Sequence, residues 1–235
     1  MHIEVVSSVN EAREARLTQR TAIVIDVLRA TSTIVTALEA GASGIVPVET
    51  VLEARALQRP GDVMAGERFC RKIAGFDLGN SPFEFTPEAV RDRRVVFTTT
   101  NGTRALHKAL RADYVLAGSL LNASACAKAA AELRRDVVIL CAGSHDEFAI
   151  EDGLCAGLII DRLQALGITT ETNDFGASMR GFYRDSRPFL TETMLQGVTG
   201  KRLVKLGCAR EIERCAQVDA SEAVPRLQGD TLVLG

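Results

Sequence analysis

Acidic side chains stand shortly after several β-branched runs of this sequence, in places where carboxylates can share a divalent cation. The acids in question are Asp26, Glu67, and the adjacent pair Glu151 and Asp152. Ligands of parallel α/β sheets bind beyond the carboxyl ends of the strands, so these side chains are expected to converge there. Carboxylate oxygens are preferred ligands of hard cations. The pattern therefore predicts a Mg²⁺ site.

Each of these acids also has a structural interpretation, which the sequence leaves open. Asp26 could cap the helix that follows it. Glu151 and Asp152 precede a helical pattern, and acids in the first turn of any helix complement its dipole. Glu67 and the neighbouring Arg68 could belong to a surface turn.

A dense run of hydroxyl and amide side chains, Thr98–Arg104, predicts a site for an anion such as phosphate. The run lies between a strand-like segment and a helix, so its backbone N–H groups point beyond the strand end. Gly102 gives the backbone the freedom to turn successive N–H groups inward. The lysine and spacing of a nucleotide-binding P-loop are missing, which disfavours nucleoside triphosphates. A solvated Asn-Gly turn is the alternative.

The segments around Asp26 and Thr98 have the same pattern, an apolar strand followed by a short polar loop and a helix, so this unit occurs twice in the sequence. Asp26 aligns with Thr98, and Thr31 aligns with Thr103 at the same offset. An ancestral duplication and a chance similarity between two ordinary strand-helix units both explain this. In either case the two loops are aimed at one cleft, one offering a carboxylate and the other hydroxyls.

The loop after Asp26 also supplies a cation and two hydroxyls that suit an anion. Arg29 can neutralise phosphate oxygens, and Thr31 and Ser32 can donate hydrogen bonds. If a helix begins near Thr31, however, one of these hydroxyls simply caps it.

Short β-branched runs alternate with helical patterns almost throughout, which predicts a mainly parallel sheet flanked by helices on both faces. No clean linker interrupts residues 1–235, so we expect one integrated α/β domain, either undivided or made of two closely packed lobes. The stretch Phe69–Pro87 reads as a long functional loop, and Asn173–Gly200 as loop-like in places. The predicted strands are Ile3–Val6, Ala22–Val27, Gly44–Val48, Asp62–Ala65, Arg94–Thr98, Tyr114–Ala117, Asp136–Cys141 and Thr231–Leu234.

Composition narrows the classes of function. The chain has 235 residues, 25% charged residues and a net charge of −2, so a nucleic-acid partner has no support. Its longest apolar runs are too short to span a membrane and no signal-like segment begins the chain, so a soluble cytoplasmic protein is expected. The 6 cysteines form no C-x-x-C pair and read as reduced thiols. The scattered histidines make zinc-hydrolase chemistry a poor fit.

Several phosphatase chemistries lack their motifs. The residue two positions after Asp26 is Leu28, so the D-x-D of aspartyl-phosphate enzymes is missing, and no R-H-G of histidine phosphatases occurs. Cys208–Arg214 has the C-x5-R spacing of cysteine phosphatases. Its interior is charged and free of glycine, which is typical of a helix rather than of a phosphate-binding loop.

Taken in order, the motifs closely resemble the 2-phosphosulfolactate phosphatase family, the ComB type. The similarity extends over nearly the whole chain. The segments that carry it are Asp26–Thr33, Gly66–Arg68, Gly79–Pro82, Thr99–Thr103, Cys141–Gly143, Glu151–Gly153, and the tail from Gln217–Asp219 to Val224-Pro225.

The resemblance implies an α/β fold of the family's own kind and a Mg²⁺-dependent hydrolysis of 2-phospho-3-sulfolactate to 3-sulfolactate and phosphate, a step of coenzyme M biosynthesis. Relatives of this family also occur outside organisms that make coenzyme M. The resemblance therefore supports hydrolysis of a phosphomonoester more firmly than it supports that one substrate.

The residues can be assigned to this chemistry as a hypothesis. Asp26, Glu151 and Asp152 are expected to hold Mg²⁺, with Glu67 as a fourth ligand, and Asp26 and Arg29 to act in catalysis. Whether Asp26 or a water attacks phosphorus is open. The residues expected to bind phosphate or the other acid groups of the substrate are Arg29, Thr31, Ser32, Arg68, Asn80, Ser81, Thr100, Asn101, Gly102, Thr103 and Arg104.

Two other functions stay open on the sequence. One is a Mg²⁺-dependent phosphatase acting on another small anionic ester. The other is a non-catalytic anion-binding protein, although its site would need to avoid so many acids. The expected partner is a small phosphate ester, and the sequence does not decide whether the protein is a homo-oligomer.

Overall fold

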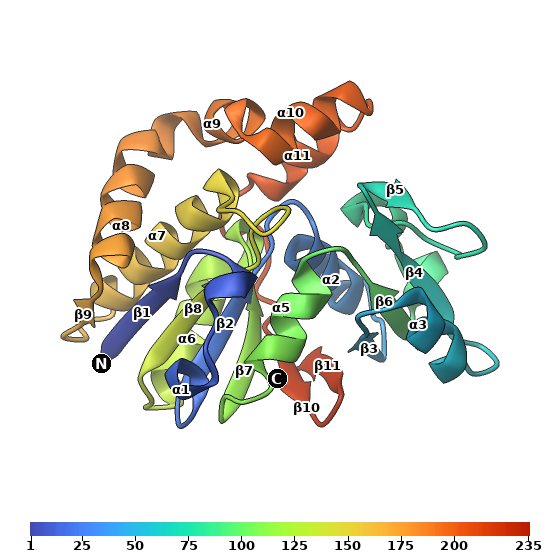
Figure 1. The fold of residues 1–235 in the computed structure, drawn as a ribbon, viewed down its shortest axis with the longest axis horizontal. Helices are drawn as coiled ribbons and strands as arrows, with labels where there is room; N and C mark the ends of the chain where they lie inside the picture. Colours follow the sequence, from blue (N-terminus) through green and yellow to red (C-terminus); the bar gives the residue numbers. More distant parts are fainter.

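An eleven-stranded sheet runs through the computed structural model, which describes residues 1–235 (Figure 1). Its strands lie in the order β5-β4-β6-β3-β11-β10-β7-β2-β8-β1-β9. Their bounds are β1 His2–Val6, β2 Thr21–Ile25, β3 Gly44–Pro47, β4 Val63–Arg68, β5 Arg71–Lys72, β6 Arg94–Thr98, β7 Tyr114–Gly118, β8 Val137–Cys141, β9 Glu171–Thr172, β10 Pro225–Gln228 and β11 Thr231–Leu234.

Helices follow most of the strands. They are α1 Glu14–Leu17, α2 Ala30–Glu39, α3 Val51–Leu57, α4 Pro87–Val90, α5 Gly102–Ala109, α6 Ala123–Glu132, α7 Ile150–Ala165, α8 Asp174–Ser186, α9 Leu190–Gln196, α10 Val198–Lys205 and α11 Ala209–Cys215. Short 3₁₀ turns occur at η1 Val9–Glu11, η2 Pro82–Glu84, η3 Leu120–Asn122 and η4 Arg187–Phe189.

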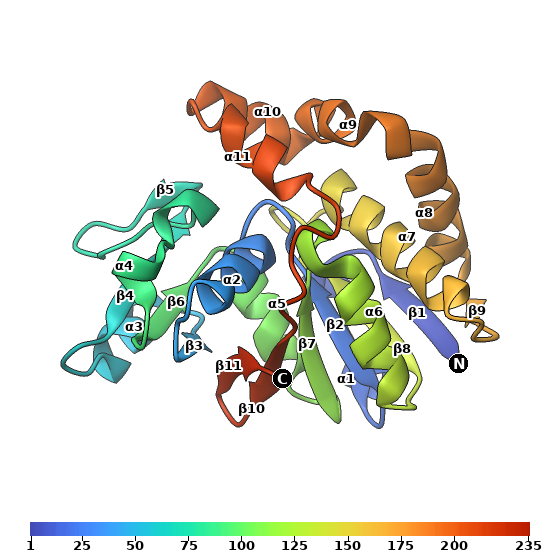
Figure 2. The ribbon, with the colours of Figure 1, turned by 180° about the vertical axis from the view of Figure 1, so that it is seen from behind.

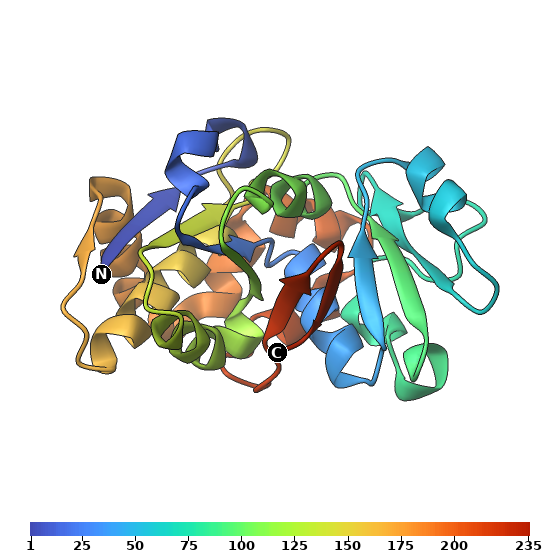
Figure 3. The ribbon, with the colours of Figure 1, turned by 90° about the horizontal axis from the view of Figure 1, so that it is seen from below.

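The sheet contains two parallel groups of strands with an antiparallel hairpin between them. One group is β7-β2-β8-β1, and the other is β3-β6-β4. The hairpin β10–β11 pairs antiparallel with β7 on one side and with β3 on the other. Figure 3 shows this hairpin, close to the C-terminus, between the two groups. The polar loops after β2 and β6 therefore approach each other from different groups.

Both faces of the central strands are buried, which explains their nearly continuous apolar sequence. In β2, Ile23 and Ile25 join a core with α6 and α7, while Ala22 and Val24 face a second core with α2 and α5. Side chains of a strand alternate between its two faces, so a single run of apolar residues serves both cores. The mainly parallel α/β arrangement with helices on both faces is confirmed.

The helices α8 to α11 form an arch that passes over the end of the sheet where β2 and β8 stop (Figures 1 and 2). Helix α8 packs along α7, where Gly157 leaves room for it. A Cβ atom at Gly157 would lie 2.2 Å from the carbonyl oxygen of Met179 in α8. The arch places α10 and α11 above the strand ends.

The prediction that Asn173–Gly200 is partly loop-like is wrong, because α8, α9 and most of the first turn of α10 fill this range. Some glycines in this range allow close packing. At Gly200, for example, a Cβ atom would lie 2.0 Å from the carbonyl oxygen of Met194 in the preceding helix.

The predicted strands agree well with the structure. Strands β6 and β11 have the expected bounds, and the bounds of most others differ by one or two residues. The strands β5, β9 and β10 were not predicted.

No helix of the structure combines the length and the apolar character of a membrane span. The repeated strand-loop-helix unit is present as β2-α2 and β6-α5, and a duplication stays a prediction.

Candidate active site

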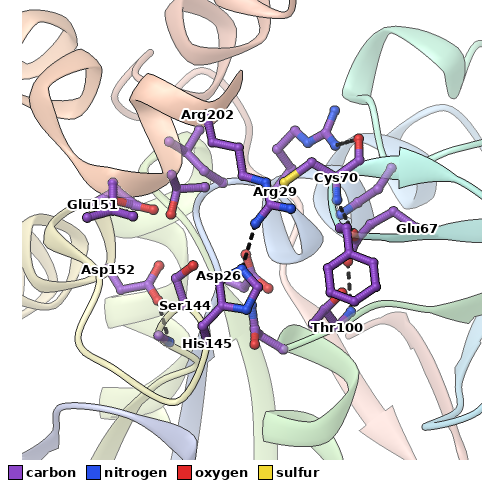
Figure 4. Close-up of a pocket in the computed structure, with 17 residues that line it drawn as sticks. Asp26, Arg29, Glu67, Cys70, Thr100, Ser144, His145, Glu151, Asp152 and Arg202 are labelled. Atoms are coloured by element: carbon purple, nitrogen blue, oxygen red, sulfur yellow. Dashed lines mark hydrogen bonds between the residues drawn. The ribbon is translucent and has the colours of Figure 1, made fainter. Parts of the chain in front are cut away.

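One cavity lies where the loops after β2, β4, β6 and β8 meet under the arch (Figure 4). In Figure 4, Glu151 and Asp152 stand on one side, Glu67 and Thr100 on the other, and Arg202 reaches in from α10. The residues that line it are Asp26, Leu28, Arg29, Glu67, Phe69, Cys70, Asn80, Thr100, Asn101, Gly143, Ser144, His145, Glu151, Asp152, Val198, Thr199 and Arg202.

Asp26 is the first residue after β2, and the start of α2 holds it in place. Its backbone N–H donates a hydrogen bond to the Thr31 hydroxyl, and that hydroxyl donates to the Asp26 carbonyl, both at 2.9 Å. The Ala30 N–H donates to Oδ1 of Asp26 at 3.2 Å. Burial raises the pKa of Asp26 from 3.8 to about 7, opposed by the Ala30 hydrogen bond and assisted by Glu67 and Glu151.

Asp152 accepts hydrogen bonds from two loops of the site. Its Oδ1 accepts a hydrogen bond from the backbone N–H of Val27 at 2.9 Å, and its Oδ2 accepts one from Gly143 at 3.0 Å. These bonds join the loops after β2 and β8. Burial, with the charges of Asp26 and Glu151, raises the pKa of Asp152 well above its ordinary value.

Glu151, next to Asp152 in the first turn of α7, has a different environment. Its Oε2 is buried and accepts no hydrogen bond. Burial raises the pKa of Glu151. Complementing the helix dipole does not require such burial, so this carboxylate suits a ligand-binding role.

Glu67, within β4, joins the two loops of the other parallel group. Its Oε1 accepts a hydrogen bond from the backbone N–H of Thr100 at 2.7 Å, and its Oε2 accepts one from Cys70 at 2.6 Å. The Thr100 N–H group is thus directed at a carboxylate rather than at an incoming anion.

Arg29 is paired with Glu211, a residue that no motif of the sequence singled out. Its Nη1 donates to Oε2 of Glu211 in α11, and its Nη2 donates to the carbonyl of Cys70 at 3.3 Å. Arg29 and Glu211 are both buried. Burial alone would lower the pKa of Arg29. The carboxylate of Glu211 outweighs this effect, so the pKa of Arg29 is raised above its ordinary value. The positive charge of Arg29 is therefore largely balanced.

The expected site residues divide into two groups. The cavity brings together Asp26, Arg29, Glu67, Asn80, Thr100, Asn101, Glu151 and Asp152. It does not include Thr31, Ser32, Arg68, Ser81, Gly102, Thr103 or Arg104.

Several residues outside the cavity have partners elsewhere. The Ser32 hydroxyl donates to the Val27 carbonyl, and the Thr103 hydroxyl donates to the Thr99 carbonyl. Each of these hydrogen bonds joins the first turn of a helix to the loop before it. Arg68 donates to the Thr98 hydroxyl. Arg104 forms an ion pair with Asp146, at 2.9 Å. Ser81 is buried, and Gly102 packs against Asp26.

The chemistry of the cavity suits a hard divalent cation. The exposed fractions of Asp26, Glu67, Glu151 and Asp152 are 7%, 6%, 2% and 1%. Buried carboxylates are costly without a compensating charge, and the free Oε2 of Glu151 is a vacant oxygen ligand. No group of three or more His, Cys, Asp or Glu side chains is already positioned to hold a metal ion. The carboxylates would need to turn toward one another to share one.

The cavity also contains residues that sequence reasoning missed. They are Phe69, Cys70, Ser144, His145, Thr199 and Arg202. His145 follows a predicted strand and is one of only 3 histidines, so its position was a usable signal. Arg202 lies in a helix far along the chain, and nothing in its local sequence connects it to the cavity.

Comparison with known proteins identifies the family. The family model described as 2-phosphosulpholactate phosphatase matches residues 6–230. Proteins named probable 2-phosphosulfolactate phosphatase are similar over nearly their whole length. The one from Caldanaerobacter subterraneus is 40% identical over 232 residues, covering 97% of this chain and 96% of its own.

Two further relatives carry the same name. That from Symbiobacterium thermophilum is 40% identical over 230 residues, covering 96% of this chain and 99% of its own. That from Thermotoga petrophila is 39% identical over 218 residues, covering 92% of each. The chain belongs to the 2-phosphosulpholactate phosphatase family.

Proposed function

We propose that this protein is a Mg²⁺-dependent phosphatase that hydrolyses 2-phospho-3-sulfolactate to 3-sulfolactate and phosphate, a reaction of the coenzyme M biosynthesis type. Family membership and the names of the full-length relatives support the reaction. The observation that carries the proposal is the meeting of four buried carboxylates at one cavity.

Asp26 and Glu151 are the best candidates to hold the cation, because each keeps a carboxylate oxygen free of hydrogen bonds within the protein. In Asp26 this is Oδ2, and in Glu151 it is Oε2. Asp152 and Glu67 would ligate through their remaining lone pairs. When bound, Mg²⁺ polarises a phosphoryl oxygen and lowers the pKa of a water molecule.

The protein groups around the phosphoryl position supply orientation and charge. Arg29 and the Thr100-Asn101 loop border the carboxylates, where they can contact equatorial phosphate oxygens. Asp26 serves phosphoryl transfer in one of two ways. It attacks phosphorus and displaces the alcohol oxygen of 3-sulfolactate, and water then hydrolyses the aspartyl phosphate, or it accepts the proton of a water that attacks phosphorus as that oxygen leaves.

A substrate panel with metal control tests the function. We expect phosphate release from 2-phospho-3-sulfolactate with a kcat/KM at least about 100-fold above that for glycerol 2-phosphate, because a site built for extra acid groups rejects esters that lack them. Activity should disappear with EDTA and return with Mg²⁺. Equal turnover of all esters would instead favour a general Mg²⁺-dependent phosphatase. Tight phosphate binding without turnover would favour an anion-binding protein.

Ionisation of Asp26 should make the metal-free protein less stable to unfolding as the pH rises from about 4 to about 7. The folded pKa of about 7 exceeds the ordinary 3.8, so the folded state holds a proton that the unfolded state has lost within this window. The shift corresponds to about 4 kcal/mol, fully present below pH 4 and lost as pH passes through 7.

Urea unfolding in EDTA, at pH values between 4.5 and 7.5, measures this contribution as the difference between wild type and Asp26→Asn. Other titrating groups largely cancel in the difference. Wild type should lose stability relative to the variant as pH rises, and Mg²⁺ should restore it at high pH. A difference that does not change with pH would show that Asp26 is ionised at no cost.

A further inference from the structure

Three side chains from distant parts of the chain meet at the cavity. Phe69 follows β4, His145 lies in the loop between β8 and α7, and Arg202 belongs to α10. Nη1 of Arg202 lies 2.6 Å from Nε2 of His145, and its guanidinium carbon lies 5.9 Å from the Phe69 ring centre. The Phe69 and His145 rings stack, with centres 6.4 Å apart and planes at 20°. Figure 4 shows Arg202 pointing down from α10 toward His145.

Arg202 is the lining cation whose charge has no acidic partner. Arg29, the other arginine of the cavity, forms a buried ion pair with Glu211. Arg202 forms no ion pair, and its partners are a histidine nitrogen and an aromatic face. An arginine so placed is available to bind an anion that enters the cavity.

His145 and Phe69 fix the direction of the Arg202 side chain. Arginine can only donate hydrogen bonds, so Nε2 of His145 is the acceptor in this contact. The Phe69 ring attracts the guanidinium through its π face. Phe69 and His145 have φ values of 56° and 51°, in the left-handed region that non-glycine residues adopt at a cost. Both loops hold unfavourable backbone geometry at the point where they contact Arg202.

We propose that Arg202, oriented by His145 and Phe69, binds an acid group of the substrate that is not transferred, a sulfonate or carboxylate on the carbon skeleton. This inference rests on the proposed phosphatase function. The phosphoryl group belongs with the cation and the carboxylates. A second acid group would be repelled by Asp26 and Glu151, and Arg202 is the unpaired cation that can receive it. Arg202 thus determines specificity, and His145 is a positioning residue.

Steady-state kinetics of Arg202→Ala test the proposal, with Lys205→Ala as control because it removes the same charge from an exposed site of α10. For 2-phospho-3-sulfolactate, we expect KM to rise about 10- to 100-fold in Arg202→Ala, as for a lost hydrogen bond to a charged group. We expect kcat to change little. Both kinetic constants for glycerol 2-phosphate, which has no further acid group, should stay near wild type.

The positioning role of His145 has its own readout. His145→Phe keeps a ring to stack on Phe69 but removes the acceptor for Arg202. KM for 2-phospho-3-sulfolactate should rise by a smaller factor than in Arg202→Ala, with kcat little changed. An unchanged KM would remove His145 from the proposal. Arg202→Lys, which keeps the charge, should recover part of the affinity even if Arg202→Ala is less stable.

Calorimetry separates this proposal from the proposed function. Binding of 3-sulfolactate, lactate and 2-hydroxyethanesulfonate to wild type and Arg202→Ala needs no turnover, and the last two ligands distinguish carboxylate from sulfonate. Weaker binding of an acid ligand to Arg202→Ala supports the proposal even if wild type hydrolyses nothing. Equal binding to both proteins overturns it. So does an equal kinetic loss on both phosphate esters, since Arg202 would then contact the phosphoryl group.

Discussion

Asp26→Asn is expected to lower phosphate release by at least about 10³-fold, as for the loss of a nucleophile or general base. The amide keeps the shape of the side chain and an oxygen for the Ala30 N–H, so the local structure is preserved. It removes the negative charge that a cation needs and the basic oxygen that phosphoryl transfer uses. The loss should therefore be in kcat, and Mg²⁺ binding should weaken as well.

Initial rates with 2-phospho-3-sulfolactate at saturating Mg²⁺, together with thermal unfolding, measure this effect. Asp185→Asn is the matched control, because Asp185 is exposed on α8 and away from the cavity. The control should retain wild-type kinetics. In EDTA near pH 7.5 the Asp26→Asn protein should be at least as stable as wild type, since a buried carboxylate is removed. Near-normal turnover in this variant would rule out Asp26 as the centre of the chemistry.

The carboxylate part of the site was predictable because a local rule determines it. Parallel strands end at one edge of the sheet, and a charge directly after an apolar run marks that edge. Asp26 follows this rule directly, whereas Glu67 lies near the end of β4 and Asp152 lies in the first turn of the helix that follows β8. The rule predicts at which edge of the sheet a side chain lies, but not which residues it contacts there. The hydrogen bonds from Val27 to Asp152 and from Thr100 to Glu67 could therefore not be predicted.

The cationic part of the site depends on contacts between distant segments. Glu211 lies 182 residues from Arg29, and Arg202 lies 57 residues from His145. The arch of α8 to α11 brings Arg202 to the cavity and Glu211 against Arg29. The hairpin β10–β11 is similar, since its insertion between β7 and β3 is set by partners far along the chain.

Gly102, expected in a phosphate-binding loop, lies outside the cavity and has a packing role in the structure. The sequence suggested backbone freedom for an anion-binding loop. In the structure, Gly102 is the first residue of α5 and allows this helix to approach the loop after β2. A Cβ atom there would lie 2.4 Å from the Cβ of Ala30 and 2.6 Å from Oδ2 of Asp26. The space is needed for the carboxylate itself.

Gly102→Ala should therefore impair both stability and activity. Alanine favours a helix over glycine by up to about 1 kcal/mol, but overpacking a buried contact costs about 1–3 kcal/mol, so a net loss of stability is expected. Displacing Asp26 by about 1 Å should lower kcat about 10²-fold. Gly181→Ala in α8 is the control, because its Cβ would meet nothing within 4 Å, and that variant should be slightly stabilised with normal kinetics.

The double variant Ala30→Gly with Gly102→Ala separates the two clashes. Removing the Ala30 methyl group relieves the contact at 2.4 Å but leaves the one with Asp26 at 2.6 Å. Stability should recover in part, measured by urea unfolding, while kcat stays low. Recovery of kcat together with stability would show that Gly102 acts through the packing of α2. A kcat that stays low in the restabilised protein ties the need for glycine at this position to the placement of the Asp26 carboxylate.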